Sequence, residues 1–84
     1  MVTVKVYGLL RLDTGIRELR AEAEDVRSLY PLLLSAAEKN RPGCGLRAAD
    51  LDGCIVMVNG VQKNKRAKLQ DGDTVVLMSP ASGG

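Results

Sequence analysis

The chain has 84 residues, enough for one small domain, and a net charge of only +2 from 12 basic and 10 acidic residues. So mild and mixed a charge does not favour nucleic-acid binding. The sequence contains no run of roughly 18 apolar residues and no basic-then-apolar leader, so we expect a soluble, cytoplasmic protein without a membrane partner. Histidine is absent, which removes the commonest general base and the commonest metal ligand, so no metal site is expected.

The two cysteines, Cys44 and Cys54, could form at most one disulfide, and their spacing fits no zinc or redox motif. Reduced structural or loop thiols are what a cytosolic chain usually carries. The sequence assigns neither cysteine a chemical role. It also contains no nucleophile motif, so a freestanding enzyme is the least favoured class of protein.

The first 24 residues predict two strands. In residues 2–7 every second side chain is valine, which is typical of a half-buried strand. Residues 9–15 are expected to lead into a turn at 13–15, where Gly15 can adopt a positive φ. Residues 16–24 alternate again, between apolar and charged side chains. We therefore predict an opening antiparallel hairpin.

Residues 25–40 change to a helical period. The apolar positions lie on one stripe of an amphipathic helix: Val26, Leu29, Tyr30, Leu33, Ala36 and Ala37. Asp25 is a good N-cap, but Pro31 would then lie inside the helix and cost a hydrogen bond. With Ser28 as the cap, Pro31 falls in the first turn, where its missing N–H matters little. We favour a loose or 3₁₀-like first turn from Asp25, with the regular helix running from near Ser28 to residues 39–40.

The second half of the chain alternates between loops and short strands. In chain order we predict an irregular loop at 41–53 with one short helical turn near 46–51, a strand at 54–58, a tight turn at Asn59-Gly60, an edge strand or loop at 61–69, a turn at 69–73 and a last strand at 74–78. The last strand is apolar at every position after Thr74, which fits a strand at the centre of the sheet.

Two hairpin-like halves on either side of one helix predict an α+β fold, the ubiquitin-like β-grasp. We expect a mixed sheet of four to five strands, with one main helix across one face. The first and last strands would lie adjacent and parallel at its centre. Residues 1–79 would form the domain, and residues 80–84 a flexible C-terminal Gly-Gly tail.

The segment "KLQDGDTVVLMSPASGG" resembles the C-terminal signature of the small subunit of molybdopterin synthase and its sulfur-carrier relatives, the MoaD/ThiS family. That signature is a leucine, an Asp-Gly-Asp turn, an apolar strand, a proline and a terminal Gly-Gly. "VTVKVYGLLRLDTG" and "IVMVNG" also look like strands and turns of this family, whereas residues 41–53 do not match. Pro80 favours the molybdopterin branch over the thiamine branch.

The resemblance implies a sulfur carrier that has no catalytic side chain and binds no cofactor of its own. An ATP-dependent adenylating enzyme, similar to ubiquitin-activating enzymes, would adenylate the terminal carboxylate of Gly84. Sulfur from a persulfide donor would then displace AMP and leave a thiocarboxylate. The large subunit of molybdopterin synthase would receive the tail and transfer its sulfur to a pterin precursor. Gly83 would let the tail thread closely into the partner, because glycine has no Cβ.

A partner must also dock on the folded domain, because ordering a free tail costs about 1 kcal/mol per residue or more. We expect the docking surface on the sheet face turned away from the helix. Its candidate residues are Met57, Val76, Met78 and Pro80. The alternative for the first three is a place in the core. The basic residues of 63–68 could contact acidic partner groups or simply form a solvated edge that discourages strand pairing.

Other functions share parts of this pattern. A carrier that supplies sulfur for thiamine or another metabolite, and a ubiquitin-like modifier that joins Gly84 to lysines of other proteins, would use the same tail. A module that binds RNA or a phosphorylated ligand through residues 63–68 is a further alternative, although the scarcity of aromatic residues argues against base stacking. The acceptor of the sulfur and the oligomeric state stay open.

Overall fold

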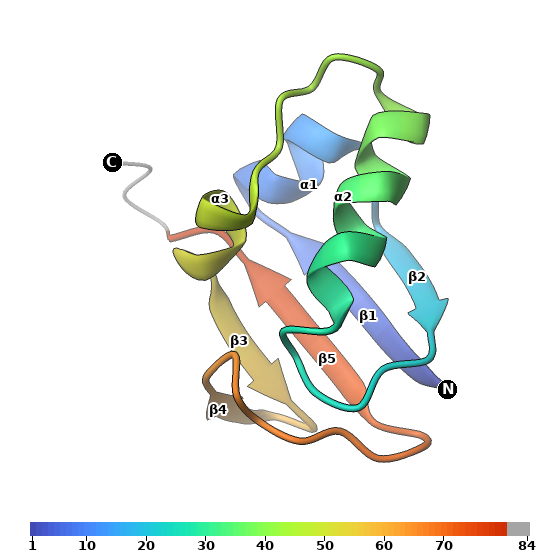
Figure 1. Cartoon of the computed structure of the whole chain (residues 1–84). Coiled ribbons are helices and arrows are strands. Elements are labelled where there is room, and N and C mark those ends of the chain that lie inside the picture. Colours follow the sequence, from blue (N-terminus) through green and yellow to red (C-terminus); the bar gives the residue numbers. More distant parts are fainter. Residues whose placement is uncertain (81–84) are drawn as a thin grey trace.

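Residues 1–80 are described by a computed structural model, in which a five-stranded sheet carries three helices on one face (Figure 1). The elements, in chain order, are β1 (Val2–Tyr7), α1 (Leu9–Thr14), β2 (Glu18–Ala21), α2 (Leu29–Asn40), α3 (Ala48–Asp52), β3 (Ile55–Val58), β4 (Val61–Lys63) and β5 (Thr74–Met78). The strand order is β2-β1-β5-β3-β4. β1 and β5 run parallel, and the other neighbours run antiparallel. The predicted β-grasp, with its first and last strands paired at the centre, is confirmed.

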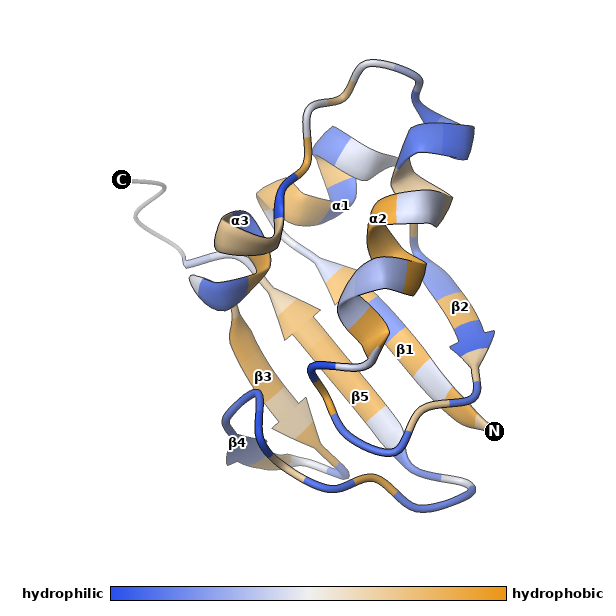
Figure 2. Ribbon diagram, viewed as in Figure 1, coloured by the Kyte–Doolittle hydropathy of each residue, from blue (hydrophilic) through white to orange (hydrophobic). Residues whose placement is uncertain are grey.

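The core lies between the sheet and α2. Every second residue of the central strands turns toward the helices and is at most 7% exposed: Val2, Val4, Val6, Val56, Val58, Val75 and Leu77. The predicted stripe of α2 meets them with Leu29, Tyr30, Leu33 and Ala37, all of which are buried. Figure 2 shows the hydrophobic residues concentrated along β3 and β5, as expected for strands near the centre of a sheet.

The start of α2 has the predicted loose first turn. The Asp25 carboxylate accepts hydrogen bonds from the backbone N–H of Ser28 at 2.8 Å and from the Ser28 hydroxyl at 2.5 Å. The N–H of Leu29 donates to the carbonyl of Val26 at 3.0 Å, which is the three-residue spacing of a 3₁₀ turn. Because the regular helix begins at Leu29, Pro31 lies in its first turn, where its missing N–H costs no hydrogen bond.

The prediction that residues 9–15 simply lead into a turn at 13–15 is wrong, because residues 9–14 form α1. Thr14, the last residue of α1, is buried, and its hydroxyl donates to the carbonyl of Leu10 at 2.7 Å and accepts from the N–H of Ile16 at 3.2 Å. Gly15 then ends the helix with a φ of +70°, the positive φ that was expected there. Burial of Leu10 and these bonds at its C-terminal end stabilise a helix too short to show a period.

The first two strands do pair antiparallel, but the second is shorter than the predicted 16–24. β2 covers only Glu18–Ala21, and α1 stands in the connection. The later predictions agree with the structure: α3 is the short helical turn in the irregular segment, and β4 lies at the edge of the sheet. Asn59 and Gly60 connect β3 to β4 with φ values of +51° and +83°, which are typical of a type I′ hairpin turn.

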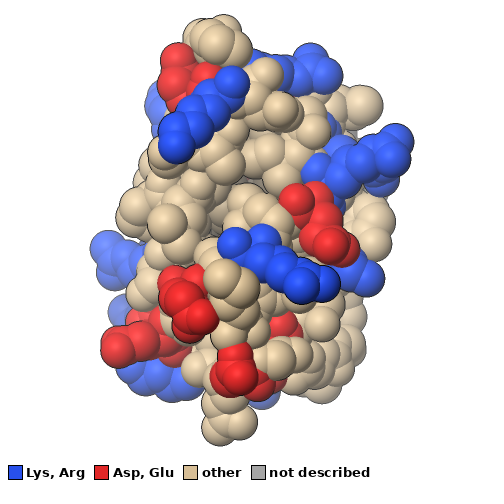
Figure 3. All heavy atoms as spheres, turned by 90° about the vertical axis from the view of Figure 1, so that its right-hand side faces the viewer, with Lys and Arg blue, Asp and Glu red and all other residues tan. Residues whose placement is uncertain are grey.

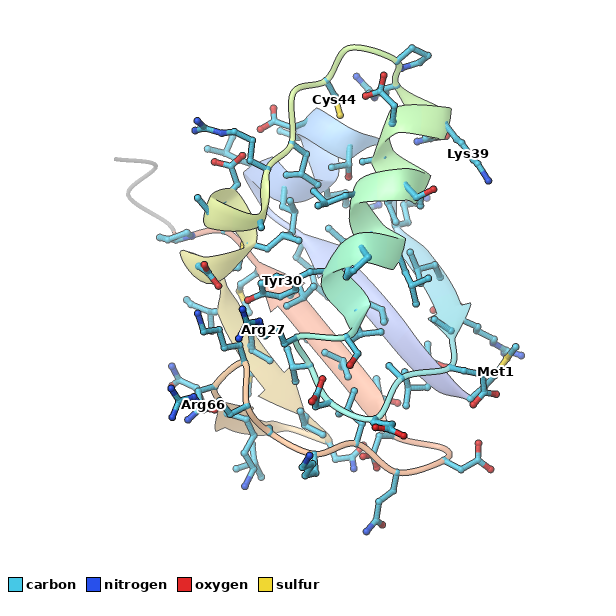
Figure 4. All side chains as sticks on the ribbon, viewed as in Figure 1. Met1, Arg27, Tyr30, Lys39, Cys44 and Arg66 are labelled. Atoms are coloured by element: carbon cyan, nitrogen blue, oxygen red, sulfur yellow. The ribbon has the colours of Figure 1, made fainter. Side chains whose placement is uncertain are left out.

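A polar cluster joins α2, α3 and the segment after β4. Tyr30 points from α2 toward α3 (Figure 4), and its hydroxyl donates to the Asp52 carboxylate at 3.1 Å. The Lys65 ammonium donates to the same carboxylate at 3.3 Å. Burial, followed by the bond to Asp52, raises the pKa of Tyr30 to about 12. The hydroxyl therefore stays protonated and holds α3 in place over the end of the sheet.

Asp73 provides a pH-sensitive link between the hairpin turn and β5. Its carboxylate accepts from the N–H of Gln70 at 2.8 Å and from the side-chain amide of Asn59 at 2.9 Å. The Gln70 bond first, and then the Asn59 bond, hold the pKa of Asp73 below the ordinary value of 3.8. The folded state thus binds the proton less readily than the unfolded state, so this stabilisation is present above pH 3.8 and is lost as the pH falls through the folded pKa.

We therefore expect the thermal stability advantage of the native chain over the Asp73→Asn variant to shrink as the pH falls below 3.8. Unfolding midpoints measured from neutral to acidic pH check this, with a side-chain NMR titration of Asp73 as the direct measurement. Asp13→Asn, the same change at an exposed carboxylate on α1, is the control. An Asp73 pKa at or above 3.8 in the folded protein would contradict the expectation.

Candidate functional site

The end of β5 leads directly to the predicted tail. Tyr7 pairs with Met78 at the last position of the parallel β1–β5 pair, and Ser79 and Pro80 follow. α1 and α3 flank this end of the sheet (Figure 1). The two residues predicted to carry the chemistry, Gly83 and Gly84, lie outside the described residues, so their roles stay predictions. We call Ser79 and Pro80 the tail root.

Gly8 allows the tail root to lie against α1. Its φ of +73° and ψ of −152° belong to a backbone region that is essentially restricted to glycine. A Cβ at this position would lie 2.6 Å from the Ser79 hydroxyl oxygen. That oxygen accepts a hydrogen bond from the backbone N–H of Leu10 at 3.1 Å. The direction in which the chain leaves β5 is therefore set by contacts with the first turn of α1.

We expect Gly8→Ala to destabilise the domain by about 1–3 kcal/mol, because alanine must adopt the strained backbone conformation and also displace Ser79. Urea unfolding of the variant measures the loss. Adding Ser79→Ala removes the crowding atom but not the backbone strain, so the double variant should recover part of the stability. Gly43→Ala is the matched control, since Gly43 also has a positive φ but nothing within 4 Å of its added Cβ. Native-like stability of Gly8→Ala would show that the close approach is unimportant.

The tail root contributes to two surface grooves. One, of about 410 Å³, is lined by Leu9, Leu10, Asp13, Cys44, Gly45, Leu46, Ala49, Asp50, Gly53, Cys54, Ser79 and Pro80. The other, of about 570 Å³, is lined by Gly8, Leu9, Arg11, Leu12, Arg17, Ser79 and Pro80. Two exposed leucines and two arginines thus stand beside the tail root in the second groove, where a partner with apolar and acidic groups could contact them.

Both cysteines line the first groove and are free thiols. Cys44 points from the loop between α2 and α3 toward the body of the protein (Figure 4). Burial, and then the neighbouring Asp50 carboxylate, raise the pKa of the Cys54 thiol, which donates to the carbonyl of Asp50 at 3.3 Å. A thiol with a raised pKa is a poor nucleophile at neutral pH, so Cys54 is not activated for catalysis.

Within residues 1–80 the acidic and cysteine side chains form no group that could hold a metal ion. In the same part of the chain, none of the helices has both the length and the apolar character needed to cross a bilayer.

An apolar patch covers the sheet face turned away from the helices. Three of its residues were predicted, namely Met57, Val76 and Met78, and each is half-buried. Their strand neighbours Val75 and Leu77 are fully buried on the opposite face, so the alternative that the three belong to the core is excluded. The fourth predicted residue, Pro80, is exposed in the tail root.

Strand register adds two residues to this surface that the sequence reasoning did not select. Met57 lies beside Val76, and Met78 lies between Ile55 and Tyr7. Tyr7 is 42% exposed. We define the outer-face patch as Tyr7, Ile55, Met57, Val76 and Met78. The alternation within β1 already placed Tyr7 on this side, but only the pairing of β1, β5 and β3 shows that the five side chains are neighbours.

The basic residues of 63–68 lie apart from the outer-face patch. Lys63 pairs with Val56, whose side chain faces the core side of the sheet, and Lys65 is held by Asp52. Arg66 points away from the body of the protein at the β4 edge (Figure 4). These residues therefore form a charged sheet edge rather than part of the outer-face patch.

A β-grasp sheet whose central strand ends in a positioned tail root, beside an exposed apolar patch, defines a small ubiquitin-like protein. The profile of the ThiS family matches residues 4–84. The chain belongs to the ThiS family, and thus to the ubiquitin-like sulfur carriers and modifiers.

Solved structures of similar fold cover almost the whole chain. Small archaeal modifier protein 1 from Haloferax volcanii is 24% identical, with 99% of this chain and 98% of that chain covered and a TM-score of 0.70. A Pyrococcus furiosus protein, described as a candidate molybdopterin converting factor subunit 1, is 27% identical, with coverages of 95% and 97% and a TM-score of 0.67. A chain of the Helicobacter pylori complex of molybdopterin-converting factor subunits 1 and 2 is 24% identical, with coverages of 99% and 97% and a TM-score of 0.61. No curated protein matches the sequence.

Proposed function

We propose that the protein is a sulfur carrier whose C-terminal glycine, Gly84, is converted to a thiocarboxylate. The terminal carboxylate attacks the α-phosphate of ATP on an adenylating partner, which releases pyrophosphate and leaves an acyl-adenylate. The terminal sulfur of a persulfide donor then attacks the acyl carbon and expels AMP. Reduction of the resulting acyl disulfide by a thiol leaves the thiocarboxylate on Gly84. The observation that carries this proposal is the match to the ThiS family, which extends to Gly84.

The residues of this chain bind the partner and present the Gly84 carboxylate to it, and the partner catalyses the reaction. Residues 80–84 can span about 17 Å when extended, at about 3.3–3.6 Å per residue, so the carboxylate can enter a site that excludes water. Exclusion matters because an acyl-adenylate hydrolyses readily. The outer-face patch supplies apolar docking area, and the contact between Ser79 and α1 fixes where the tail leaves the domain. ATP belongs to the partner's chemistry, and the carrier itself holds no cofactor.

For the sulfur acceptor we propose a pterin precursor bound by a larger subunit, which makes this chain the small subunit of a molybdopterin synthase. Pro80 in the tail root supports this choice, as does the similarity to the Pyrococcus furiosus protein. The second candidate is a protein modifier that joins Gly84 to lysines, and the similarity to the small archaeal modifier protein favours it. Both use the same activated carboxylate.

Intact-mass measurement of the protein from its own cells tests the carrier function. We expect a fraction of the chains to carry one oxygen-to-sulfur replacement, located at Gly84 by fragmentation. Incubation of purified carrier with ATP, a persulfide donor and the adenylating enzyme from the same cells should raise that fraction. If neither preparation contains the replacement, the carrier proposal fails. Covalent adducts between Gly84 and lysines of other proteins, without sulfur transfer to a pterin, would instead identify the modifier.

A further inference from the structure

β2 is one edge of the sheet, and its outer side is unpaired in the part of the chain that the structure describes. The strand order places β1 on one side of β2 and no strand on the other. The N–H of Val6 donates to the carbonyl of Arg17 at 3.0 Å, so this pair is a hydrogen-bonded pair of the antiparallel ladder. Because such pairs alternate, Leu19 also bonds to β1, and the backbone groups of Glu18 and Arg20 point away from the sheet.

Side chains with complementary properties alternate along this free edge. Glu18 and Arg20 are exposed on the face opposite the helices, because they pair with Lys5 and Thr3. Leu19 lies between them on the helix face and is half-buried against the core. The edge is therefore neither uniformly charged nor uniformly apolar. The three residues with which a neighbouring strand would pair are acidic Glu18, apolar Leu19 and basic Arg20.

We propose that β2 pairs antiparallel with β2 of a second copy of this chain, with the two Leu19 side chains facing each other on the two-fold axis. In this register Glu18 of each copy is opposite Arg20 of the other. Each of these two pairs exchanges both backbone hydrogen bonds, and each carries opposite charges on the outer face. A two-fold interface of this kind needs a self-complementary edge, and β2 has one.

The charges select this register over its neighbours. Centring the pairing on Arg20 would place the two Arg20 side chains opposite each other and Glu18 opposite Glu22. Centring it on Ala21 would place Glu18 opposite Glu24 and would put Arg20 opposite Glu22, but Glu22 and Glu24 lie beyond the end of β2. Both arrangements bring like charges together, which destabilises a strand pair. The Leu19-centred register also lets Glu18 lie between Lys5 of its own chain and Arg20 of the second copy.

The other edge of the sheet is unsuited to the same pairing. β4 has three residues and is followed by Lys65, Arg66 and Lys68, so two copies would bring basic side chains together. The side of the molecule on which β2 lies in Figure 1 instead carries both signs of charge interspersed, as Figure 3 shows. The charge distribution thus directs self-association to β2.

Apolar groups beside β2 add to the interface. Leu19 and Ala36 line a shallow groove of about 420 Å³ between β2 and α2. Leu32, one helical turn before Ala36 on the same face of α2, is 41% exposed although it is a large apolar residue. In the joined sheet both copies of α2 lie on the same face, so these side chains are brought toward the two-fold axis. β1 separates β2 from Met57, Val76 and Met78 of the outer-face patch, and the pairing uses no residue of the tail, so the inference does not depend on the proposed function.

The oligomeric state of the full chain tests the proposal. Sedimentation equilibrium from micromolar to millimolar concentration should show a mass that rises from one chain toward two. Glu18→Arg and Arg20→Glu should each weaken association at least about tenfold, because each creates two like-charge pairs across the axis. Combining both substitutions in one chain should restore association. Mixing the two single variants should produce a heterodimer, in which every cross-strand pair is again of opposite charge.

The mixing experiment distinguishes a disrupted interface from a misfolded variant, because two single variants can associate with each other only if both are folded. Lys63→Glu, which makes the same charge change as Arg20→Glu at the other edge, is the control and should leave association unchanged. A mass of one chain at every concentration would overturn the proposal. So would association that is equally strong in all variants, which would place the contact on another surface.

Discussion

Deleting Gly84 should abolish formation of the thiocarboxylate while leaving the folded domain as stable as before. The deletion leaves a carboxylate on Gly83, but that group is about 3.3–3.6 Å short of the position where the adenylating partner holds the α-phosphate. Acyl transfer depends steeply on such distances, so displacement of the reacting atom by even about 1 Å can cost about a hundredfold in rate. Intact mass after incubation with the partner, ATP and a persulfide donor measures the effect.

Two further variants show whether the length of the tail or the absence of side chains at its end matters for sulfur transfer. Gly84→Val keeps the length but adds a branched side chain next to the reacting carboxylate, and we expect it to be as inactive as the deletion. Ser82→Ala keeps both the length and the glycines and should be converted like the native chain. If the Gly84 deletion still acquires sulfur, the chemistry lies elsewhere and both tail-based functions are excluded.

Replacing Met57 by Gln and Val76 by Thr together should weaken binding to the adenylating partner at least about tenfold. The substitutions keep the size of both side chains but place polar groups at the centre of the outer-face patch, where Met57 and Val76 are neighbours across β3 and β5. Loss of about 1.4 kcal/mol lowers affinity tenfold, and residues near the centre of an interface are the ones that can cost more than about 1 kcal/mol when changed. Titration calorimetry or fluorescence anisotropy of the carrier with the partner measures the loss.

Val61→Thr is the matched control for that pair of substitutions. Val61 is 54% exposed on the edge strand β4 and lies outside the outer-face patch, so the same type of change should leave the affinity unaltered. Thermal unfolding should show that the double variant is folded. Native affinity in a folded double variant would mean that the partner docks on another surface, such as the groove that contains Arg11 and Arg17.

The parts of the fold predicted correctly are those in which one periodicity persists over several residues. The alternation of valines located β1, and the apolar stripe from Val26 to Ala37 located α2. α1 was missed because only Leu10 and Thr14 of its six residues are buried, which is too few to define a helical period. The signals that could have indicated it are local: a threonine able to bond within the last turn, followed by Gly15 as a C-cap.

The sequence predicted which residues of the last strand face away from the helices, but not which residues of other strands lie beside them. Alternation along β5 shows that Val76 and Met78 lie on the opposite face from Val75 and Leu77. It does not show which side chains of β1 and β3 lie beside them. That information is in the strand register, which depends on tertiary pairing. The contact between Gly8 and Ser79 joins residues far apart in the chain, and no pattern in the sequence marks it.

The parallel pair of β1 and β5 joins the two ends of the domain, since Val4 is aligned with Val75. During synthesis β1 leaves the ribosome before every other element of the domain, and its central partner β5 is the last element to follow. A truncated product that stops before Thr74 lacks β5, two of the five residues of the outer-face patch and the tail root together. A partner that docks on the outer-face patch would therefore engage only chains in which β5 has been made, so the order of assembly itself tests whether the sheet is complete.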